Sequence, residues 1–263
     1  MISFIGAGPG APDLITLRGR DRLAAADVVV WASSLVPEAM LAHARPGAAV
    51  HDSATMTLED VVTVYSEAGP DAAVVRLHSG DPSVYGAIGE QVDWCVANER
   101  DFEIVPGVSS LAAASAAIGR ELTQPGVAQS VVLTRLAGRT AASMPAGESV
   151  AAFAAHGTTM AVFLSAARPV ELAGELLATG SGYTADTPAA IVVRASWPDE
   201  RAVMTTVGRL AGDLADLGAR TTVLVLVGPA LAGTAGRSHL YSPGFAHMFR
   251  RRSAPGSTTG RPA

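Results

Sequence analysis

The sequence predicts an α/β protein made of two successive units of alternating strands and helices, the first a mostly parallel sheet with helices on its faces. Short apolar runs rich in β-branched residues alternate with stretches in which apolar residues recur every three and four positions, as on a helix face. The alternation breaks near 122–128, where Gln124-Pro125-Gly126 form a turn-like connector, and then resumes. We therefore expect an N-terminal α/β domain over 1–122 and a C-terminal α/β domain over 129–231.

The first domain contains four buried strands and three helices by this pattern. The helix near 58 has a readable start, because Thr57 is a capping residue followed by the acidic first turn Glu59-Asp60. Strands are expected at 2–5, 28–31, 73–77 and 103–105, and helices at 17–26, 58–67 and 88–98.

The second domain continues the alternation, with one additional strand that we expect to be antiparallel. Strands are expected at 130–134, 160–164, 190–193 and 222–227, the additional strand at 201–206, and helices at 170–179 and 207–217. After about residue 232 the chain becomes rich in Gly, Ser, Pro and Arg. We expect an extension over 232–263 whose final dozen residues are disordered.

Composition and charge exclude several classes of function. The 263 residues are 49% hydrophobic, but no apolar run approaches the roughly 20 residues that span a bilayer. The formal net charge is -5, which argues against a nucleic-acid partner, since phosphate binding needs a positive face. The N-terminus has no basic region or cleavage site, so no signal peptide is expected. These features predict a cytoplasmic protein without a membrane partner.

The single cysteine, Cys95, lies among apolar neighbours in an expected helix. One thiol cannot form an internal disulfide, and no Cys/His cluster has the spacing of metal ligands. We therefore expect Cys95 to be a small buried apolar residue, and we expect no metal site.

The first candidate for chemistry is the glycine-rich loop Gly6-Ala7-Gly8-Pro9-Gly10, directly after the first strand. Glycines let the backbone turn sharply and let a ligand approach it. A dinucleotide-binding turn would have glycine where Ala11 stands, and Pro9 removes a backbone N–H that a pyrophosphate would use. These departures disfavour a dinucleotide site, so a nicotinamide-dependent oxidoreductase rests on this loop alone, and an ordinary glycine-rich turn is the stronger alternative for it.

Two further strand-to-helix loops carry candidate site residues. One, after a buried strand, is His78-Ser79-Gly80-Asp81-Pro82-Ser83-Val84-Tyr85-Gly86. Ligands of α/β sheets bind beyond the carboxyl ends of strands, and Asp81 can accept hydrogen bonds from loop amides or a ligand. An Asp-Pro turn without function fits the segment as well. The other is Val105-Pro106-Gly107-Val108-Ser109-Ser110, whose serines could simply cap the following alanine-rich helix.

Taken together and in this order, these loops resemble the tetrapyrrole (uroporphyrinogen/precorrin) methyltransferase family. Residues 5–19 are similar to the family's N-terminal signature, and Gly80-Asp81, Tyr85-Gly86 and Pro106-Gly107 to its second one. The resemblance covers residues 1 to 231. It implies two α/β domains with a cleft between them for S-adenosylmethionine, and a homodimer.

Finer features resemble the branch of the family that methylates precorrin-4 at ring carbon C11, to give precorrin-5, on the way to cobalamin. These features are Ala32-Ser33-Ser34-Leu35-Val36-Pro37, the loop at 78–88, Thr134-Arg135 with Gly138-Arg139-Thr140, Ala195-Ser196-Trp197-Pro198-Asp199-Glu200, and Arg237-Ser238-His239-Leu240-Tyr241-Ser242-Pro243. Ser196 stands where threonine is more usual in the family, and Trp31 where tyrosine is.

The resemblance also implies which residues contact the cofactor. In the first domain they are Pro9, Gly80, Asp81, Val84, Ser109 and Ser110. In the second domain they are Leu164 (or Ser165), Ala195 and Gly228.

The sulfonium of S-adenosylmethionine is an activated methyl carrier, so such an enzyme needs no protein nucleophile. Catalysis then comes mainly from holding the substrate carbon and the methyl group in line, with water excluded. His78 could assist proton movement, although a structural histidine at a strand end is the alternative. Arg135 and Arg139 are candidates to clamp substrate carboxylates, because guanidinium pairs with them bidentately; solvated surface arginines are the alternative.

Several alternatives stay open at this point. The substrate could carry cobalt, and the methylated position could be another precorrin carbon or one on uroporphyrinogen. A diphthine precursor or ribosomal RNA could be the acceptor instead, although the absence of a basic face disfavours RNA. A different class, besides the nicotinamide-dependent oxidoreductase, is a tetrapyrrole-binding protein without catalysis.

Overall fold

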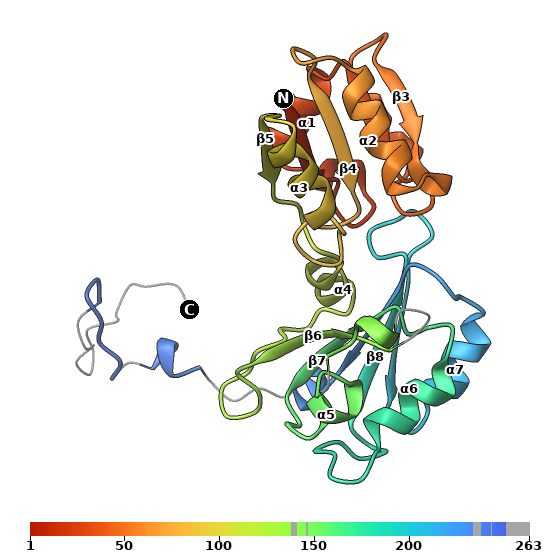
Figure 1. The fold of residues 1–263 in the computed structure, drawn as a ribbon. Helices are drawn as coiled ribbons and strands as arrows, with labels where there is room; N and C mark the ends of the chain where they lie inside the picture. The colour runs from red at the N-terminus through yellow and green to blue at the C-terminus, as the bar shows by residue number, and fades with distance from the viewer. Residues whose placement is uncertain (138–140, 146, 234–237, 243, 251–263) are drawn as a thin grey trace. The chain divides into compact units, whose positions relative to one another are not determined.

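The structure is a computed structural model that describes residues 1–137, 141–145, 147–233, 238–242 and 244–250. It contains two five-stranded sheets flanked by helices (Figure 1). The α/β fold class with two sheets, expected from the sequence, is confirmed.

The chain divides into two compact units, each assembled from separate stretches. The first comprises Met1–Gly119, Ile191–Val203 and Ala219–Leu224, and the second comprises Arg120–Ala190, Met204–Gly218 and Val225–Ala263. The segment around Ala195 therefore belongs to the first unit, with the glycine-rich loop. The domain boundaries expected at 1–122 and 129–231 stay a prediction.

The first sheet is entirely parallel, with the strand order β3-β2-β4-β1-β5. Strands β1 and β4 run in register, so that Gly6 is paired with His78. The loops that follow these two residues consequently leave the sheet at the same edge. The strands are β1 (Ile2–Gly6), β2 (Val28–Trp31), β3 (Ala49–Asp52), β4 (Val74–His78) and β5 (Phe102–Val105).

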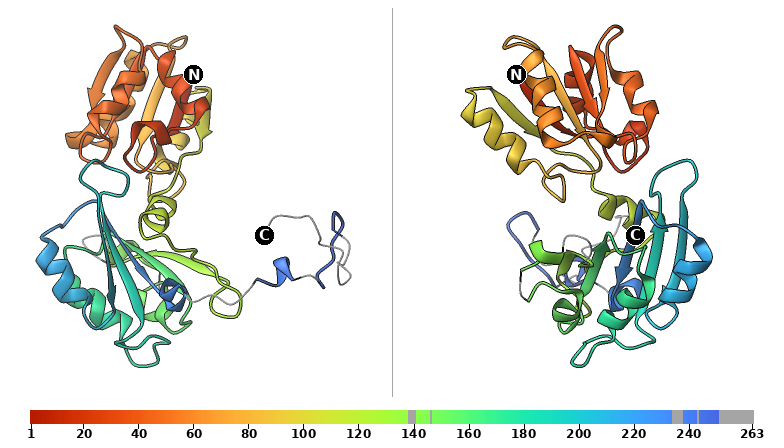
Figure 2. Two further views of the ribbon diagram at one scale, coloured as in Figure 1. Left: turned by 180° about the vertical axis from the view of Figure 1, so that it is seen from behind. Right: turned by 45° about the vertical axis from the view of Figure 1, so that its right-hand side comes forward.

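Helices cover both faces of the first sheet, as the two further views in Figure 2 illustrate. Neighbouring residues of a strand point to opposite faces, so Ile5 packs in a core with Leu23 of α1 while Phe4 packs in another with Tyr65 of α2 and Cys95 of α3. The helices are α1 (Leu17–Ala24), α2 (Leu58–Glu67), α3 (Gly89–Ala97) and α4 (Ser110–Ala117). Cys95 is fully buried, as expected.

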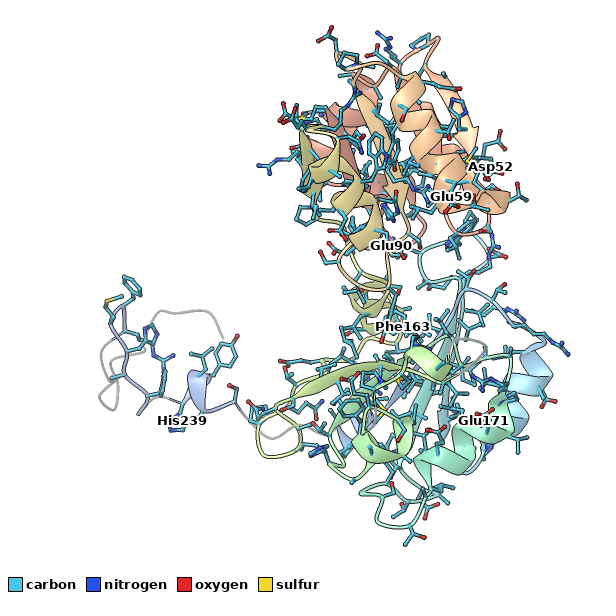
Figure 3. All side chains as sticks on the ribbon, in the orientation of Figure 1. Asp52, Glu59, Glu90, Phe163, Glu171 and His239 are labelled. Atoms are coloured by element: carbon cyan, nitrogen blue, oxygen red, sulfur yellow. The ribbon has the colours of Figure 1, made fainter. Side chains whose placement is uncertain are left out.

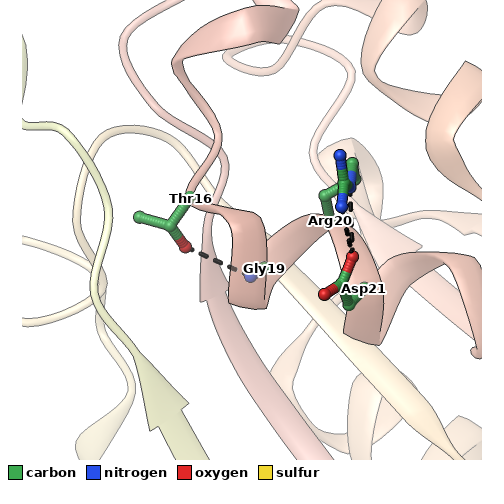
Figure 4. Close-up of polar contacts among 4 residues, drawn as sticks. All are labelled: Thr16, Gly19, Arg20 and Asp21. Atoms are coloured by element: carbon green, nitrogen blue, oxygen red, sulfur yellow. Dashed lines mark hydrogen bonds and ion pairs between the residues drawn. The ribbon is translucent and has the colours of Figure 1, made fainter.

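Side-chain caps start three of these helices, α1, α2 and α4. The Thr57 hydroxyl accepts a hydrogen bond from the Asp60 N–H at 3.3 Å, and the Asp60 carboxylate accepts one from the Thr57 N–H at 2.9 Å, which completes a capping box. Thr16 caps α1 by accepting from the Gly19 N–H at 3.1 Å (Figure 4). The predicted start of α2 is thus confirmed.

The second sheet has the order β6-β7-β10-β8-β9. Strands β6 and β7 are parallel, but β7 and β10 are antiparallel, so this sheet is mixed. The predicted antiparallel direction of β9 stays a prediction. The strands are β6 (Val131–Arg135), β7 (Thr159–Phe163), β8 (Pro188–Val193), β9 (Arg201–Thr206) and β10 (Val223–Val227), and the helices are α5 (Val150–Ala154), α6 (Pro169–Leu176) and α7 (Leu210–Leu217).

Short 3-10 turns and one edge strand complete the described fold. Strand β3 was not expected; Asp52 at its end accepts from the Ser33 N–H at 3.1 Å and is labelled in Figure 3. The 3-10 turns are Pro12–Leu14, Glu38–His43, Ser53–Thr55, Ala141–Ser143, Pro229–Ala232 and His239–Tyr241.

No helix in the described part of the chain is long and apolar enough to cross a membrane. The final dozen residues, expected to be disordered, lie outside the described residues.

Candidate cofactor and substrate site

Three loops meet where β1, β4 and β5 end, and glycines make the contact. A Cβ atom on Gly107 would lie 2.1 Å from the Gly80 carbonyl oxygen and 2.6 Å from the Gly6 Cα atom. A Cβ atom on Gly6 would lie 2.5 Å from the same carbonyl oxygen. The three predicted motif loops are therefore in direct backbone contact, at a point with no room for a side chain.

Backbone hydrogen bonds hold the first two loops together. The Gly80 N–H donates to the Gly8 carbonyl at 2.8 Å, the Gly8 N–H donates to the Gly80 carbonyl at 3.3 Å, and the Ala7 N–H donates to the His78 carbonyl at 2.8 Å. Gly8 and Gly80 have φ angles of 80° and 65°, a region that favours glycine. Pro9 follows directly on this backbone pair.

Asp81 connects the second loop to the third. Its carboxylate accepts hydrogen bonds from the Gly107 N–H at 2.8 Å and from the Ser83 N–H at 2.8 Å. Burial alone would raise the pKa of Asp81, but the hydrogen bonds from Gly107 and Ser83 outweigh it, and the pKa is lowered. Asp81 is therefore an ionised carboxylate at neutral pH.

The loop after Asp81 is conformationally strained. Tyr85 and Ala87 have φ angles of 57° and 50°, which are uncommon for residues with a side chain. Between them, a Cβ atom on Gly86 would lie 2.1 Å from the Pro82 carbonyl oxygen. Val84 lies in the middle of this loop, and its N–H donates to the Asp81 carbonyl at 3.3 Å.

Ser109 and Ser110 start α4 beside Gly80. The Ser109 hydroxyl accepts from the Leu111 N–H at 3.2 Å and is the N-cap, as expected from the sequence. A Cβ atom on Gly80 would lie 3.7 Å from the Ser110 nitrogen and 3.8 Å from the Ser109 Cα atom. Both serines thus lie at the junction of the loops.

His78 is buried at the end of β4, with only 6% of its surface exposed. Burial and the positive charge of Arg76 lower the pKa of His78 to about 3, although a hydrogen bond with the Gly86 backbone acts in the opposite direction. The Nε2 atom has no hydrogen-bond partner among the described residues. The imidazole is therefore neutral at neutral pH, and it packs near the ring of Phe4, with 6.1 Å between centroids.

The segment at the end of β8 approaches the glycine-rich loop. Ala195 is buried between Arg194 and Ser196, whose φ angles are 50° and 65°. The Ser196 hydroxyl accepts from the Ala11 N–H at 3.0 Å, and the indole N–H of Trp197 donates to the Pro9 carbonyl at 2.9 Å. Sequence reasoning noted this segment as a family feature but did not foresee its contact with residues 9–11.

The remaining predicted cofactor residues belong to the second unit. Leu164 follows β7 with a φ angle of 52° and is 69% exposed, whereas Ser165 is fully buried, and its hydroxyl lies 3.3 Å from the Val162 carbonyl. Gly228 follows β10 with a φ angle of 145°, and a Cβ atom there would lie 2.9 Å from the Thr158 carbonyl oxygen. Of the two alternatives at this strand end, Leu164 is therefore the exposed residue.

Of the two candidate arginines for substrate binding, Arg135 falls in the second unit. Arg135 is the last residue of β6, and its guanidinium donates to the Ser143 hydroxyl at 3.0 Å. Arg139 lies outside the described residues. No group of three or more His, Cys, Asp or Glu side chains in the described ranges is arranged to hold a metal ion.

The structure therefore brings one set of predicted residues together in the first unit, whereas the other described ones belong to the second unit. Pro9, Gly80, Asp81, Val84, Ser109, Ser110 and Ala195 lie in the first unit, whereas Leu164, Gly228 and Arg135 lie in the second. The loops of the first unit present backbone polar groups, glycine surfaces and one ionised carboxylate at the carboxyl edge of a parallel sheet. Such a set of groups suits a small polar ligand.

A family comparison identifies the class of protein that has this fold and these loops. The family model for tetrapyrrole (corrin/porphyrin) methylases matches residues 1–211. The chain belongs to this family, and the resemblance inferred from its motifs is confirmed.

Individual relatives define the branch of the family more narrowly. A precorrin-4 C(11)-methyltransferase from Sinorhizobium sp is 45% identical over 253 residues, covering 95% of this chain and 98% of that protein. The solved structure of a cobalt precorrin-4 methyltransferase, CbiF, has a TM-score of 0.83 and 43% identity, covering 88% of this chain and 95% of the solved one. These relatives are methyltransferases, which favours that reaction over nicotinamide-dependent oxidoreduction.

One further structure bears on the cofactor. A uroporphyrin-III C-methyltransferase from Thermus thermophilus was solved in complex with S-adenyl homocysteine. It has a TM-score of 0.73 and 31% identity, covering 88% of this chain and 99% of that one.

Proposed function

We propose that this chain transfers a methyl group from S-adenosylmethionine to C11 of precorrin-4, giving precorrin-5 in cobalamin biosynthesis. One observation carries the proposal: a precorrin-4 C(11)-methyltransferase is 45% identical over 253 residues and is covered to 98% of its length. The match also covers 95% of this chain.

The loop junction of the first unit supports S-adenosylmethionine as the methyl donor. Gly6, Gly80 and Gly107 pack backbone against backbone, which leaves main-chain N–H and C=O groups rather than side chains to meet a ligand. The ionised carboxylate of Asp81 provides negative charge beside them, which suits a donor that carries positive groups. We assign the donor contacts to Pro9, Gly80, Asp81, Val84, Ser109, Ser110, Leu164, Ala195 and Gly228.

When bound, the donor supplies an activated methyl group on a sulfonium, so the protein need not provide a nucleophile. The residues of this chain then have two tasks. The strained loop at Tyr85 and Ala87 and the glycine junction hold a defined backbone surface, and this fixes the donor's orientation toward the substrate carbon. A preorganised site of this kind loses little free energy in ordering itself when the reaction occurs.

We also propose that Arg135 and Arg139 hold carboxylates of the tetrapyrrole. The support is chemical, because a guanidinium binds a carboxylate through two parallel N–H groups and so fixes orientation as well as affinity. Arg135 ends β6, and its anchoring to Ser143 shows that the guanidinium is already held by a neighbouring hydroxyl.

A specific observation favours a second candidate substrate, cobalt-precorrin-4. The solved structure with a TM-score of 0.83 is that of a cobalt precorrin-4 methyltransferase, at 43% identity. That identity is close to the 45% of the precorrin-4 relative, so the comparison supports both substrates nearly equally.

We propose that the chain forms a homodimer, as the family resemblance implies. Apolar side chains are exposed on the two edge strands of the second sheet, with Leu133 of β6 at 39% and Met204 of β9 at 45%. Static light scattering measures the mass of the assembly; a mass of one chain at micromolar concentration contradicts the dimer.

The reaction is tested by incubating the protein with enzymatically made precorrin-4 and methyl-labelled S-adenosylmethionine, followed by mass spectrometry and carbon NMR. We expect one added methyl group, at C11. A parallel incubation with cobalt-precorrin-4 decides between the two substrates by relative kcat/KM. Methylation of a different position or of uroporphyrinogen alone would overturn the assignment to C11, and no transfer to any tetrapyrrole would overturn the function.

A further inference from the structure

Two loops that are far apart in the chain are bound to each other in the first unit. The indole N–H of Trp197 donates to the Pro9 carbonyl at 2.9 Å, and the Ala11 N–H donates to the Ser196 hydroxyl at 3.0 Å. Residues 196–197 thus use the polar backbone groups on both sides of Gly10. We call residues 194–200 the clasp segment.

Residue 10 must be a glycine because the ring of Trp197 leaves no room for a side chain there. A Cβ atom on Gly10 would lie 2.2 Å from Cδ1 and 2.5 Å from Nε1 of the indole ring. The backbone of Gly10 does not adopt a positive φ angle, so its conformation alone does not require glycine. The requirement comes from the ring, which occupies the position that a side chain at residue 10 would need.

Other residues of the clasp segment also contact the indole ring and each other. The Arg194 guanidinium carbon lies 3.9 Å from the centroid of the Trp197 ring, and Arg194 Nε donates to the Asp199 carboxylate at 2.7 Å. The Ser196 N–H donates to Glu200 Oε2 at 2.6 Å. These contacts hold Arg194 and Ser196 at φ angles of 50° and 65°, a conformation that costs energy and persists only where its surroundings impose it.

We propose that Trp197 is a positioning residue for the methyl donor. The inference rests on the proposed function, in which Pro9 and Ala195 both contact S-adenosylmethionine. Trp197 joins the segments that carry these two residues, since its indole is bound to Pro9 and its backbone N–H donates to the Arg194 carbonyl at 2.9 Å. It therefore sets the spacing between the two donor contacts before the donor arrives, without itself taking part in methyl transfer.

The test measures S-adenosylhomocysteine binding by calorimetry, and KM for S-adenosylmethionine separately from kcat, in the full-length chain. Trp197→Phe keeps a ring but loses the indole donor, so we expect affinity to fall about three- to tenfold, the usual effect of one hydrogen bond. Trp197→Ala, which removes the whole ring, should lower the affinity further. In both variants KM for the donor should rise, whereas kcat at saturating donor should change less than about twofold, since only binding is affected.

Gly10→Ala provides an independent test, because it displaces the ring without changing it. We expect its affinity to match that of Trp197→Ala, and we expect the double variant to bind no more weakly than either single one, as direct packing requires. Trp94→Phe is the matched control, since Trp94 lies in α3 against Tyr65, with 5.8 Å between ring centroids. It should leave the affinity unchanged.

Two results would overturn the inference alone: a wild-type chain that binds S-adenosylhomocysteine while Trp197→Ala binds it equally well, or additive effects of Gly10→Ala and Trp197→Ala. A wild-type chain that fails to bind S-adenosylhomocysteine overturns the proposed function as well. Melting temperatures of all variants separate a loss of affinity from a loss of folded protein.

Discussion

At the scale of single residues, the Asp81 carboxylate connects two of the loops that form the candidate site. It joins the loop after β4 to the loop after β5 by accepting from the Gly107 N–H, and it shapes its own loop by accepting from the Ser83 N–H. The same hydrogen bonds lower the pKa of Asp81 despite its partial burial. One side chain therefore sets both the geometry and the charge of this junction.

Replacing Asp81 by alanine should loosen the junction and destabilise the protein. Two backbone N–H groups lose their acceptor, so we expect the free energy of unfolding to fall by about 1–3 kcal/mol, with weaker binding of S-adenosylhomocysteine. Asp81→Asn keeps one acceptor and should show a smaller effect. Urea unfolding measures the difference. Asp21→Ala, which removes an exposed ion pair with Arg20, is the control and should change stability by less than about 0.5 kcal/mol.

His78 makes stability depend on pH, and the sign follows from its lowered pKa. Its pKa is about 3 in the folded chain, against about 6.5 for an unperturbed histidine. Between these values the unfolded chain binds a proton that the folded chain does not, so stability is complete above pH 6.5 and decreases as the pH falls toward 3. The expected slope is up to about 1.4 kcal/mol per pH unit.

Unfolding experiments at a series of pH values check this dependence. His78→Asn should reduce the slope between pH 6.5 and pH 3 by the contribution of one proton. An unchanged slope in His78→Asn would contradict a neutral, buried imidazole.

Single residues also show where sequence reasoning reached its limit. The motif glycines Gly6, Gly80 and Gly107 were found because they stand in three recognisable loops, and the structure brings those loops together. Trp197 was seen only as part of a family feature. Its partner Pro9 lies 188 positions away, so no local pattern could indicate the contact.

At the scale of elements, buried apolar runs marked the predicted strands most clearly, although β5, which was wrongly expected to be buried, and β9 were also predicted and contain mainly exposed or half-buried residues. Strands β1 and β4 are apolar along most of their length, and their hydrophobic runs mark them clearly. Strand β3 (Ala49–Asp52) was missed because it is an exposed edge strand without an apolar run. Helix α5 (Val150–Ala154) was missed because five residues are too few to show a helical period.

The ends of elements depend on backbone conformations that the sequence does not reveal. The expected strand at 160–164 ends at Phe163, because Leu164 adopts a φ angle of 52° and leaves the sheet. The antiparallel pairing of β7 with β10 was not foreseen, since alternation of strands and helices does not fix which strands become neighbours.

The junction of the three loops should tolerate no side chain at Gly107. The added methyl group of Gly107→Ala would overlap the Gly80 carbonyl oxygen, 2.1 Å away, so we expect a loss of about 1–3 kcal/mol in unfolding free energy together with loss of S-adenosylhomocysteine binding. Thermal and urea unfolding, and calorimetry, measure the two effects.

Gly174→Ala is the matched control for this substitution. Gly174 lies within α6, and nothing surrounds the position where its Cβ atom would be. Alanine there should stabilise the chain by about 0.5–1 kcal/mol, because it restricts the unfolded backbone and favours the helix. A Gly107→Ala protein as stable as wild type would contradict the close approach of the loops.

At the scale of the whole molecule, charge must be reconciled with the proposed substrate. The chain has a net charge of -5, whereas precorrin-4 is a polycarboxylate, so long-range electrostatics oppose binding. All 19 basic residues are arginines, since the sequence contains no lysine. Arginine binds carboxylates bidentately, and a few residues at the site can therefore outweigh the overall repulsion.

Substrate binding should consequently weaken as salt is added, while donor binding should not. Opposite charges in contact at the site attract each other, and salt screens that attraction over about 10 Å at 0.1 M. We expect KM for the tetrapyrrole to rise with ionic strength, and the Arg135→Gln and Arg139→Gln variants to raise it by roughly tenfold or more at low salt, since a hydrogen bond to a charged group contributes about 1.5–3 kcal/mol. The salt dependence should be smaller in both variants.

Arg209→Gln removes the same charge from an exposed residue that pairs only weakly with Asp213 at 3.5 Å, and it serves as the control. If attraction at the site outweighs the net charge, this control should keep both the wild-type KM for the tetrapyrrole and its salt dependence. If Arg209→Gln raised KM as much as Arg135→Gln, the overall charge of the molecule, and not a local clamp, would govern substrate binding. Affinity for S-adenosylhomocysteine should stay constant in all three variants, because none of the three arginines is assigned to the donor.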